Sequence, residues 1–148
     1  MRQATDDLAF TRLAEALRDF YIRSQSVLEK LLAEEGISYA KMRVIYFIGL
    51  NEGARSVDLM KAFGHAPRTV TEAVDALERD GLVERVPDPR DRRAKKILLT
   101  AAGQQMFEAA EPIRRRLGTE IFGVLDAKEQ KALQEMLKRM SERLAALE

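Results

Sequence analysis

The residues best suited to chemistry in this sequence are the arginines and lysines that cluster between Arg85 and Lys96. This segment holds six basic residues and two acidic ones, in a chain whose net charge is only +1. A local basic patch on a nearly neutral protein can form a surface for phosphate groups. Arginine suits such a surface because its guanidinium group is planar and always charged. The alternative interpretation is a solvated charged turn, which is common.

A second polar cluster lies earlier in the chain, where residues 67–72 (PRTVTE) open a predicted helix. A helix that enters the major groove presents its first residues to base edges. Arg68 can bond both acceptors of a guanine, and threonine hydroxyls can bond bases or phosphates. An ordinary surface helix is the alternative. The residues expected to contact DNA are Ser56, Pro67, Arg68, Thr69, Thr71, Glu72, Arg90, Arg92, Arg93 and Lys95.

Composition excludes several kinds of site. The chain has no cysteine and one histidine, so disulfides, Cys-ligated metals and multi-histidine metal sites are ruled out. No Gly-rich phosphate loop is present, and we expect neither an enzyme nor a cofactor. No apolar run approaches the roughly 20 residues that span a membrane, and no signal-peptide core is visible, so a cytoplasmic protein is expected. His65 either contacts phosphate, senses pH or packs between helices.

Apolar periodicity predicts a mainly helical chain. The expected helices span about 5–35, 39–50, 57–63 and 67–80, and two more follow Thr100 and Asp126. Ser38, Ser56 and Thr100 are predicted N-caps, and Asp126 with Glu129 resembles a capping box. Pro112 lies inside the first of the last two helices, so a kink or break is expected near 110–111.

Two strand-like runs, 82–86 and 95–99, flank a polar turn at 87–94. A hairpin directly after two short helices is typical of a winged helix-turn-helix. Asp88 and Asp91 would repel phosphate, so we expect one of them to pair with a neighbouring arginine and stiffen the loop. Arg92 is then the first expected DNA contact and Arg90 the next, while Arg93 is tied to an acid.

The fold class predicted is mainly α with a small β-hairpin wing (a minor α+β character). Residues 36–104 would form the DNA-binding lobe, and 1–35 with 105–148 a helical dimerisation region. The terminal helices carry more apolar surface than one small domain can cover, and pairing with a second copy would bury it.

Two motifs resemble the MarR family of bacterial transcriptional regulators, and the resemblance covers nearly the whole chain. Residues 91–100 (DRRAKKILLT) fit the family's wing pattern, and residues 68–83 resemble its recognition helix and exit. Ala66 departs from the pattern, because the family often has a Ser or Asp there that caps the helix. The absence of a capping side chain weakens the cap by ~1 kcal/mol.

The resemblance implies a homodimer whose terminal helices form a base and whose two lobes bind a pseudo-palindromic operator in double-stranded DNA. It also implies repression that is relieved when a small aromatic or phenolic acid binds between base and lobe. The residues expected to bind this effector are Arg12, Arg18, Tyr21, Tyr39, Arg43 and Tyr46. The alternative function is a winged-helix module that binds proteins and has no regulated DNA binding.

Overall fold

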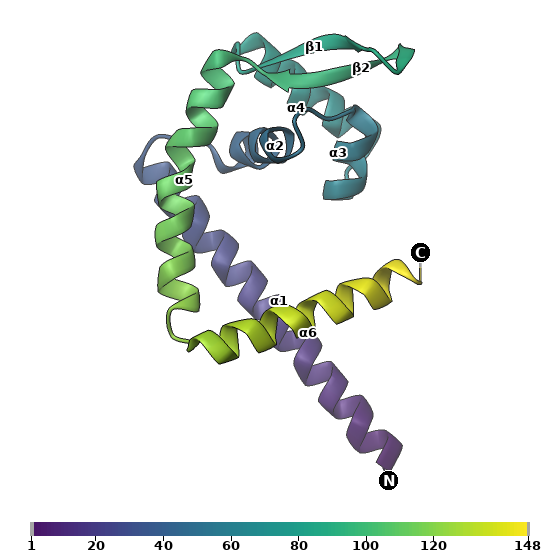
Figure 1. Ribbon diagram of the computed structural model, residues 1–148, viewed down its shortest axis with the longest axis vertical. Coiled ribbons are helices and arrows are strands. Elements are labelled where there is room, and N and C mark those ends of the chain that lie inside the picture. Colours follow the sequence, from purple (N-terminus) through teal and green to yellow (C-terminus); the bar gives the residue numbers. More distant parts are fainter. Residues whose placement is uncertain (1, 148) are drawn as a thin grey trace. The chain divides into compact units, whose positions relative to one another are not determined.

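A computed structural model describes the backbone of residues 2–147 and the side chains of residues 8–91 and 93–147. Within this part, six helices accompany one two-stranded hairpin, which confirms the predicted fold class (Figure 1). The elements are α1 (Arg2–Glu34), α2 (Tyr39–Leu50), α3 (Ser56–Phe63), α4 (Pro67–Arg79), β1 (Val83–Asp88), β2 (Asp91–Leu99), α5 (Ala101–Phe122) and α6 (Ala127–Ala145). The chain forms two compact units, residues 1–113 and 114–148.

The core of the first unit is built around α2, as its apolar composition indicates. Helix α2 contacts α1, α4 and β2, while α4 contacts α3 and β1 (Figure 1). Ile45 and Ile48 of α2, Val74 and Leu77 of α4, and Ile97 of β2 are almost inaccessible to solvent. Each such side chain contributes roughly 1.5–3 kcal/mol through burial, so α2 holds the two short helices and the hairpin together as one lobe.

The turn between α3 and α4 follows the sequence prediction. Gly64 ends α3 with a φ of 62°, a left-handed conformation that costs glycine little. Helix α4 begins at Pro67 after Ala66, whose side chain makes no capping hydrogen bond. His65 in this turn is exposed, and its ring centroid lies 5.9 Å from that of Phe63.

The hairpin is longer than the sequence indicated. Its strands pair antiparallel from Val83 opposite Leu99 to Asp88 opposite Asp91, with an irregularity after Pro87. The expected turn over 87–94 is therefore wrong, because residues 89–90 alone separate the strands. The charged residues that suggested a loop are compatible with the solvent-facing side of a two-stranded ribbon.

A short backbone contact that the sequence did not predict joins α3 to the hairpin. The N–H of Ala54 donates to the carbonyl of Ile97 at 3.0 Å, and the N–H of Ile97 returns the bond at 2.7 Å. A pairing of one residue has no periodicity, so no sequence pattern reveals it. The bridge fixes the chain just before α3 against β2.

Helix α5 starts as predicted, because the Thr100 hydroxyl accepts a hydrogen bond from the Gly103 N–H at 3.1 Å. Of the kink or break expected near 110–111, the break does not occur, since α5 continues through Pro112 to Phe122, and the kink stays a prediction. Proline removes the donor to the carbonyl four residues earlier, at Glu108. Glu108 is exposed, so water can replace that donor.

In the second unit, the predicted capping box at the start of α6 is confirmed. The Glu129 N–H donates to Asp126 at 2.8 Å, and the Asp126 N–H donates to Glu129 at 2.9 Å. Helix α6 buries none of its described residues. No helix in the described part of the chain combines the length and apolar character needed to span a membrane.

Candidate nucleic-acid interface

The first turn of α4 presents polar side chains to solvent. The Arg68 side chain is 89% exposed, and its Nε donates to Glu72 at 2.8 Å. Thr69 is exposed, and the Thr71 hydroxyl donates to the Pro67 carbonyl at 2.9 Å. An exposed ion pair of this kind contributes about 0–1 kcal/mol, so a nucleic acid can displace Glu72 from Arg68 at little cost.

The remainder of α4 is tied to the hairpin by an arginine of the basic cluster between residues 85 and 96. Arg85 of β1 donates to Asp75 at 2.5 Å and also pairs with Glu78. Its side chain is largely covered, because only 21% is exposed. Arg85 therefore neutralises two acids of α4 and holds this helix against β1.

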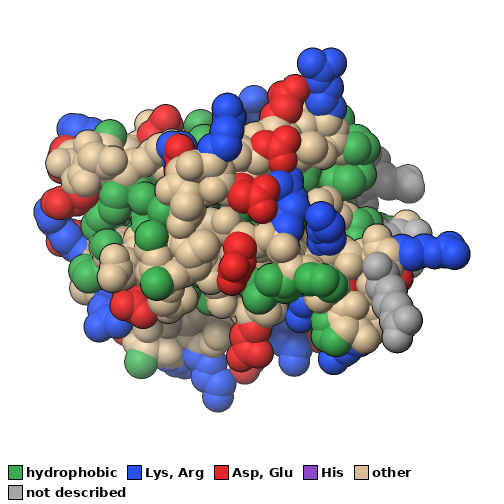
Figure 2. All heavy atoms as spheres, turned by 90° about the horizontal axis from the view of Figure 1, so that it is seen from above, with side chains coloured by type: hydrophobic (Ala, Val, Ile, Leu, Met, Phe, Trp, Pro, Cys, Tyr) green, Lys and Arg blue, Asp and Glu red, His purple; other side chains and the backbone are tan. Residues whose placement is uncertain are grey.

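Seen from the side of the hairpin, acidic and basic side chains are interleaved and do not form one uniformly basic surface (Figure 2). This agrees with a net charge of +1. A phosphate-binding surface on this protein therefore depends on the positions of a few individual arginines and not on a broad positive charge.

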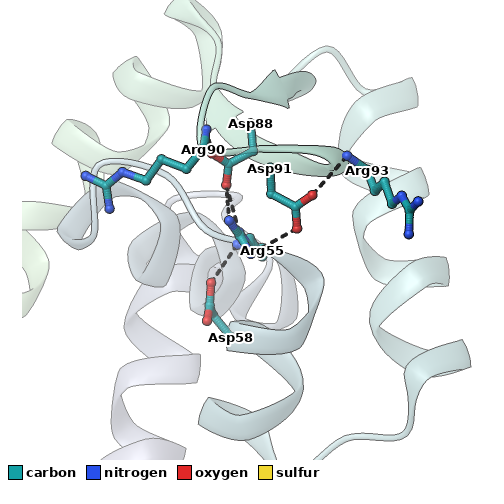
Figure 3. Close-up of polar contacts among 6 residues, drawn as sticks. All are labelled: Arg55, Asp58, Asp88, Arg90, Asp91 and Arg93. Atoms are coloured by element: carbon teal, nitrogen blue, oxygen red, sulfur yellow. Dashed lines mark hydrogen bonds and ion pairs between the residues drawn. The ribbon is translucent and has the colours of Figure 1, made fainter.

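The tip of the hairpin is organised by Arg55, the residue before α3 (Figure 3). Its Nη2 lies 2.5 Å from Asp88 Oδ2, and its Nε donates to the same oxygen at 2.8 Å. Its Nη1 lies 3.9 Å from Asp91 Oδ2. The two acids therefore pair with an arginine from outside the loop, which the sequence did not predict. A pairing of either acid with the Arg92 side chain stays a prediction, because that side chain is not among those described.

Each of these acids also accepts a backbone N–H from two residues further along. Asp88 Oδ1 accepts from Arg90 at 2.8 Å, and Asp91 Oδ1 accepts from Arg93 at 3.0 Å. The expected tie between Arg93 and an acid thus runs through its backbone. The side chains of Arg90 and Arg93 extend away from Arg55 (Figure 3).

Asp88 is the buried acid of this cluster, with 3% of its surface exposed. The Arg90 N–H and the Arg55 guanidinium hold the pKa of Asp88 below its ordinary value, although burial acts in the opposite direction. Asp88 therefore stays ionised at neutral pH, and its charge is directed inward at Arg55.

The other predicted contact residues lie on the same lobe. Ser56 is the first residue of α3 and is exposed, but the predicted capping role is wrong, because Arg55 is the N-cap and its N–H donates to Asp58 at 2.8 Å. Pro67 and Lys95 are exposed. The side chain of Arg92 lies outside the described side chains. Arg55 was missed because its partners are distant in sequence.

The predicted effector residues are only partly brought together. Arg43 of α2 places its Cζ 4.7 Å from the Phe63 ring centroid and 5.9 Å from that of Tyr39. Burial, and to a smaller extent Tyr21, raises the pKa of Tyr39, while Arg43 lowers it. Tyr46 instead stacks on Phe107 of α5, with centroids 5.5 Å apart. No described contact links Arg12 or Arg18, both exposed on α1, to this group.

Known proteins that are similar to this chain identify its family. Residues 35–94 match the MarR family. The transcriptional regulator HosA of Escherichia coli is 31% identical over 132 residues, which cover 89% of this chain and 93% of HosA. The chain belongs to the MarR family. It is a transcriptional regulator of the winged-helix type, which confirms the resemblance seen in the sequence.

Two solved structures show the same fold as this MarR-family chain. A MarR mutant from E. coli complexed with operator DNA has a TM-score of 0.74 and 25% identity, and covers 87% of this chain and 93% of its own. BpsR of Bordetella bronchiseptica, whose DNA binding is regulated by 6-hydroxynicotinic acid, has a TM-score of 0.71 and 25% identity. That match covers 86% of this chain and 91% of BpsR.

Proposed function

We propose that this protein is a homodimeric repressor that binds a pseudo-palindromic operator in double-stranded DNA. The observation that carries the proposal is the exposure of Arg68 and Thr69 at the start of α4, on the lobe whose hairpin carries the exposed Arg90 and Arg93. The start of α4 would read base edges in the major groove. The hairpin arginines would contact phosphates or the minor groove. The complex of a similarly folded E. coli MarR mutant with operator DNA supports operator DNA as the partner.

The two functions of the chain would be divided between its segments. Residues 36–104 would contact DNA, and residues 1–35 with 105–148 would form the dimer. Exposed apolar side chains on α1 and α6 support this division, because a second copy could bury them. The protein would act in the cytoplasm and carry out no catalysis.

We further propose that a small aromatic or phenolic acid relieves repression. The position of Arg43 beside the Tyr39 ring supports this, because an arginine can pair with a carboxylate and a tyrosine can stack on a ring. The regulation of BpsR by 6-hydroxynicotinic acid supports an aromatic acid as the class of ligand.

The test is DNA binding by the purified protein, using fragments selected from the source genome. We expect affinity in roughly the nanomolar range for the selected operator, and a fall in affinity with added salt, because phosphate contacts release counterions. Arg92→Ala should weaken binding to all sequences. Arg68→Ala should also relax the preference at one base by about 1–3 kcal/mol.

Lys41→Ala is the matched control, because it also removes one positive charge from the lobe. Lys41 of α2 pairs with Asp80, which follows the last residue of α4 and lies far from Arg68 along that helix. Its affinity should stay close to that of the wild-type protein. Binding that survives the loss of both Arg68 and Arg92 would contradict the contact model. No salt-dependent binding at low ionic strength would favour the protein-interaction module instead.

A further inference from the structure

We propose that Arg55 is a positioning residue that sets the DNA-contacting arginines of the hairpin through Asp88 and Asp91. The proposal rests on the proposed function, in which the hairpin contacts DNA. Arg55 would act without touching DNA itself, by fixing the direction in which Arg90 and Arg93 leave the hairpin.

The backbone of Arg55 is anchored on both sides. The preceding residue, Ala54, exchanges two backbone hydrogen bonds with Ile97 of β2. The N–H of Arg55 donates to Asp58 in the first turn of α3 at 2.8 Å. Arg55 therefore starts from a fixed point between α3 and the hairpin, and its side chain reaches the hairpin tip from there.

The guanidinium group of Arg55 faces both acids of the tip. Two of its nitrogens contact Asp88 Oδ2, at 2.5 and 2.8 Å, and the third lies 3.9 Å from Asp91 Oδ2. The Asp88 side chain is only 2% exposed, so water cannot readily replace Arg55 there. A planar group with several donors can satisfy two carboxylates at once, which a lysine ammonium does poorly.

The other oxygen of each carboxylate holds the backbone of an outward-pointing arginine. Asp88 Oδ1 accepts from the Arg90 N–H, and Asp91 Oδ1 accepts from the Arg93 N–H. Such contacts two residues ahead define a local turn of the backbone. Since an isolated two-stranded hairpin is only marginally stable in water, the two turns need an anchor, and Arg55 supplies it (Figure 3).

This arrangement predicts that the substitution Asp88→Asn changes DNA affinity in the opposite direction to the usual one. Neutralising an acid beside a DNA-binding surface normally strengthens binding, because a repulsive charge is removed. Asp88→Asn should instead weaken binding, because the Arg90 turn loses its link to Arg55. If Arg55 contacted phosphate directly, Asp88→Asn would leave binding unchanged or improve it.

The experiment measures operator affinity by fluorescence anisotropy for Arg55→Ala, Asp88→Asn, the double variant and the Lys41→Ala control. Each single variant at the tip should lose about tenfold in affinity, and the double variant should lose no more than Arg55→Ala alone, as expected for coupled residues. In a protein that already carries Arg90→Ala, the further change Arg55→Ala should reduce operator affinity by a much smaller factor than it does in the wild-type protein. Lys41→Ala should stay within about twofold of wild type, since it breaks an ion pair outside the tip.

A second measurement reports on the tip without DNA. Exchange of the Arg90 and Arg93 amide hydrogens should accelerate in Arg55→Ala and stay unchanged in Lys41→Ala. If Arg55→Ala does not fold, Arg55→Lys provides the same comparison, with a smaller acceleration and a partial loss of affinity.

The outcomes separate the two proposals. Tighter or unchanged binding by Asp88→Asn, or additive losses in the double variant, would overturn the positioning role in a protein that still binds DNA. Amide exchange that Arg55→Ala leaves unchanged would do the same. A wild-type protein that binds no genomic fragment would overturn the proposed function itself, and the role of Arg55 in DNA binding with it.

Discussion

At the scale of single residues, the partner of a charged side chain decides its role more than its type does. Arg55 and Arg85 are held by acids from other elements, whereas Arg68 is almost fully exposed. Arg43 represents a third case, because it lies over the Phe63 ring. Burial raises the pKa of the nearby Tyr39 hydroxyl, although Arg43 lowers it, so this hydroxyl stays protonated and can donate to an anion.

The effector proposal is tested at these two residues. Hydroxylated aromatic acids, with 6-hydroxynicotinic acid among them, should weaken operator binding by the wild-type protein. Arg43→Ala should lower ligand affinity by about tenfold or more, because a charge-assisted contact is lost. The effect of the ligand on operator binding should weaken accordingly. Tyr39→Phe should lower ligand affinity by a smaller factor.

Because the Tyr39 pKa is raised, ligand affinity should show no loss from Tyr39 ionisation until the pH exceeds about 10. The measurement is operator affinity with and without ligand. An equal response in wild type and Arg43→Ala would exclude this group as the ligand site.

At the scale of elements, α5 shows how one residue type can have opposite effects along a helix. A Cβ on Gly103 would lie 2.0 Å from the Leu82 carbonyl oxygen, where α5 meets the start of the hairpin. A Cβ on Gly118 would meet nothing within 4 Å. Gly103 thus permits a close approach of two backbones, and Gly118 has no such function.

Alanine substitutions at these two glycines should therefore change stability in opposite directions. Gly103→Ala should lower the free energy of unfolding by about 1–3 kcal/mol, because backbone or helix must shift. Gly118→Ala should raise it by about 0.4–1 kcal/mol, because alanine restricts the unfolded chain. Thermal unfolding at one fixed protein concentration measures both. A loss at Gly118 as large as that at Gly103 would contradict this explanation.

The elements also show what the sequence can and cannot predict. Helix α2 and its Ser38 cap, the capping box of α6 and the hairpin all have local signals, and the structure confirms them. The pairing of Arg55 with Asp88 has none, because 33 positions separate the two residues. The extension of the hairpin was missed because its charged residues suggested a loop, and the unbroken course of α5 was missed because Pro112 suggested a helix end.

At the scale of the whole molecule, each compact unit leaves apolar side chains uncovered. On α1, Phe10 is 65% exposed and Leu13 is 62% exposed. On α6, Leu144 is 64% exposed, and Met136, Leu137 and Met140 are also exposed. Exposed apolar side chains repeated along a helix are typical of an interaction site, which agrees with a second copy of the chain as partner.

The dimer is tested by placing a charge on one of these faces. The wild-type protein should sediment at twice the mass of the chain, and Leu13→Glu should shift it toward the monomer and weaken operator binding, because two half-sites are no longer bound together. Glu15→Gln, an exposed change on the same helix, is the control and should leave the dimer intact. Wild-type protein that sediments as a monomer at micromolar concentration would contradict the dimer.

The interleaving of acids and bases beside the hairpin has a consequence for how such a regulator searches a chromosome. A genome offers roughly 10⁶–10⁹ competing sites to any protein that adheres to phosphate. Affinity for random sequence comes almost entirely from charge, and here Asp75 and Glu78 absorb the charge of Arg85, while Asp88 absorbs that of Arg55. The charges of these two arginines are therefore unavailable for contacts with arbitrary DNA, which would reduce the share of time that the protein spends on wrong sequences.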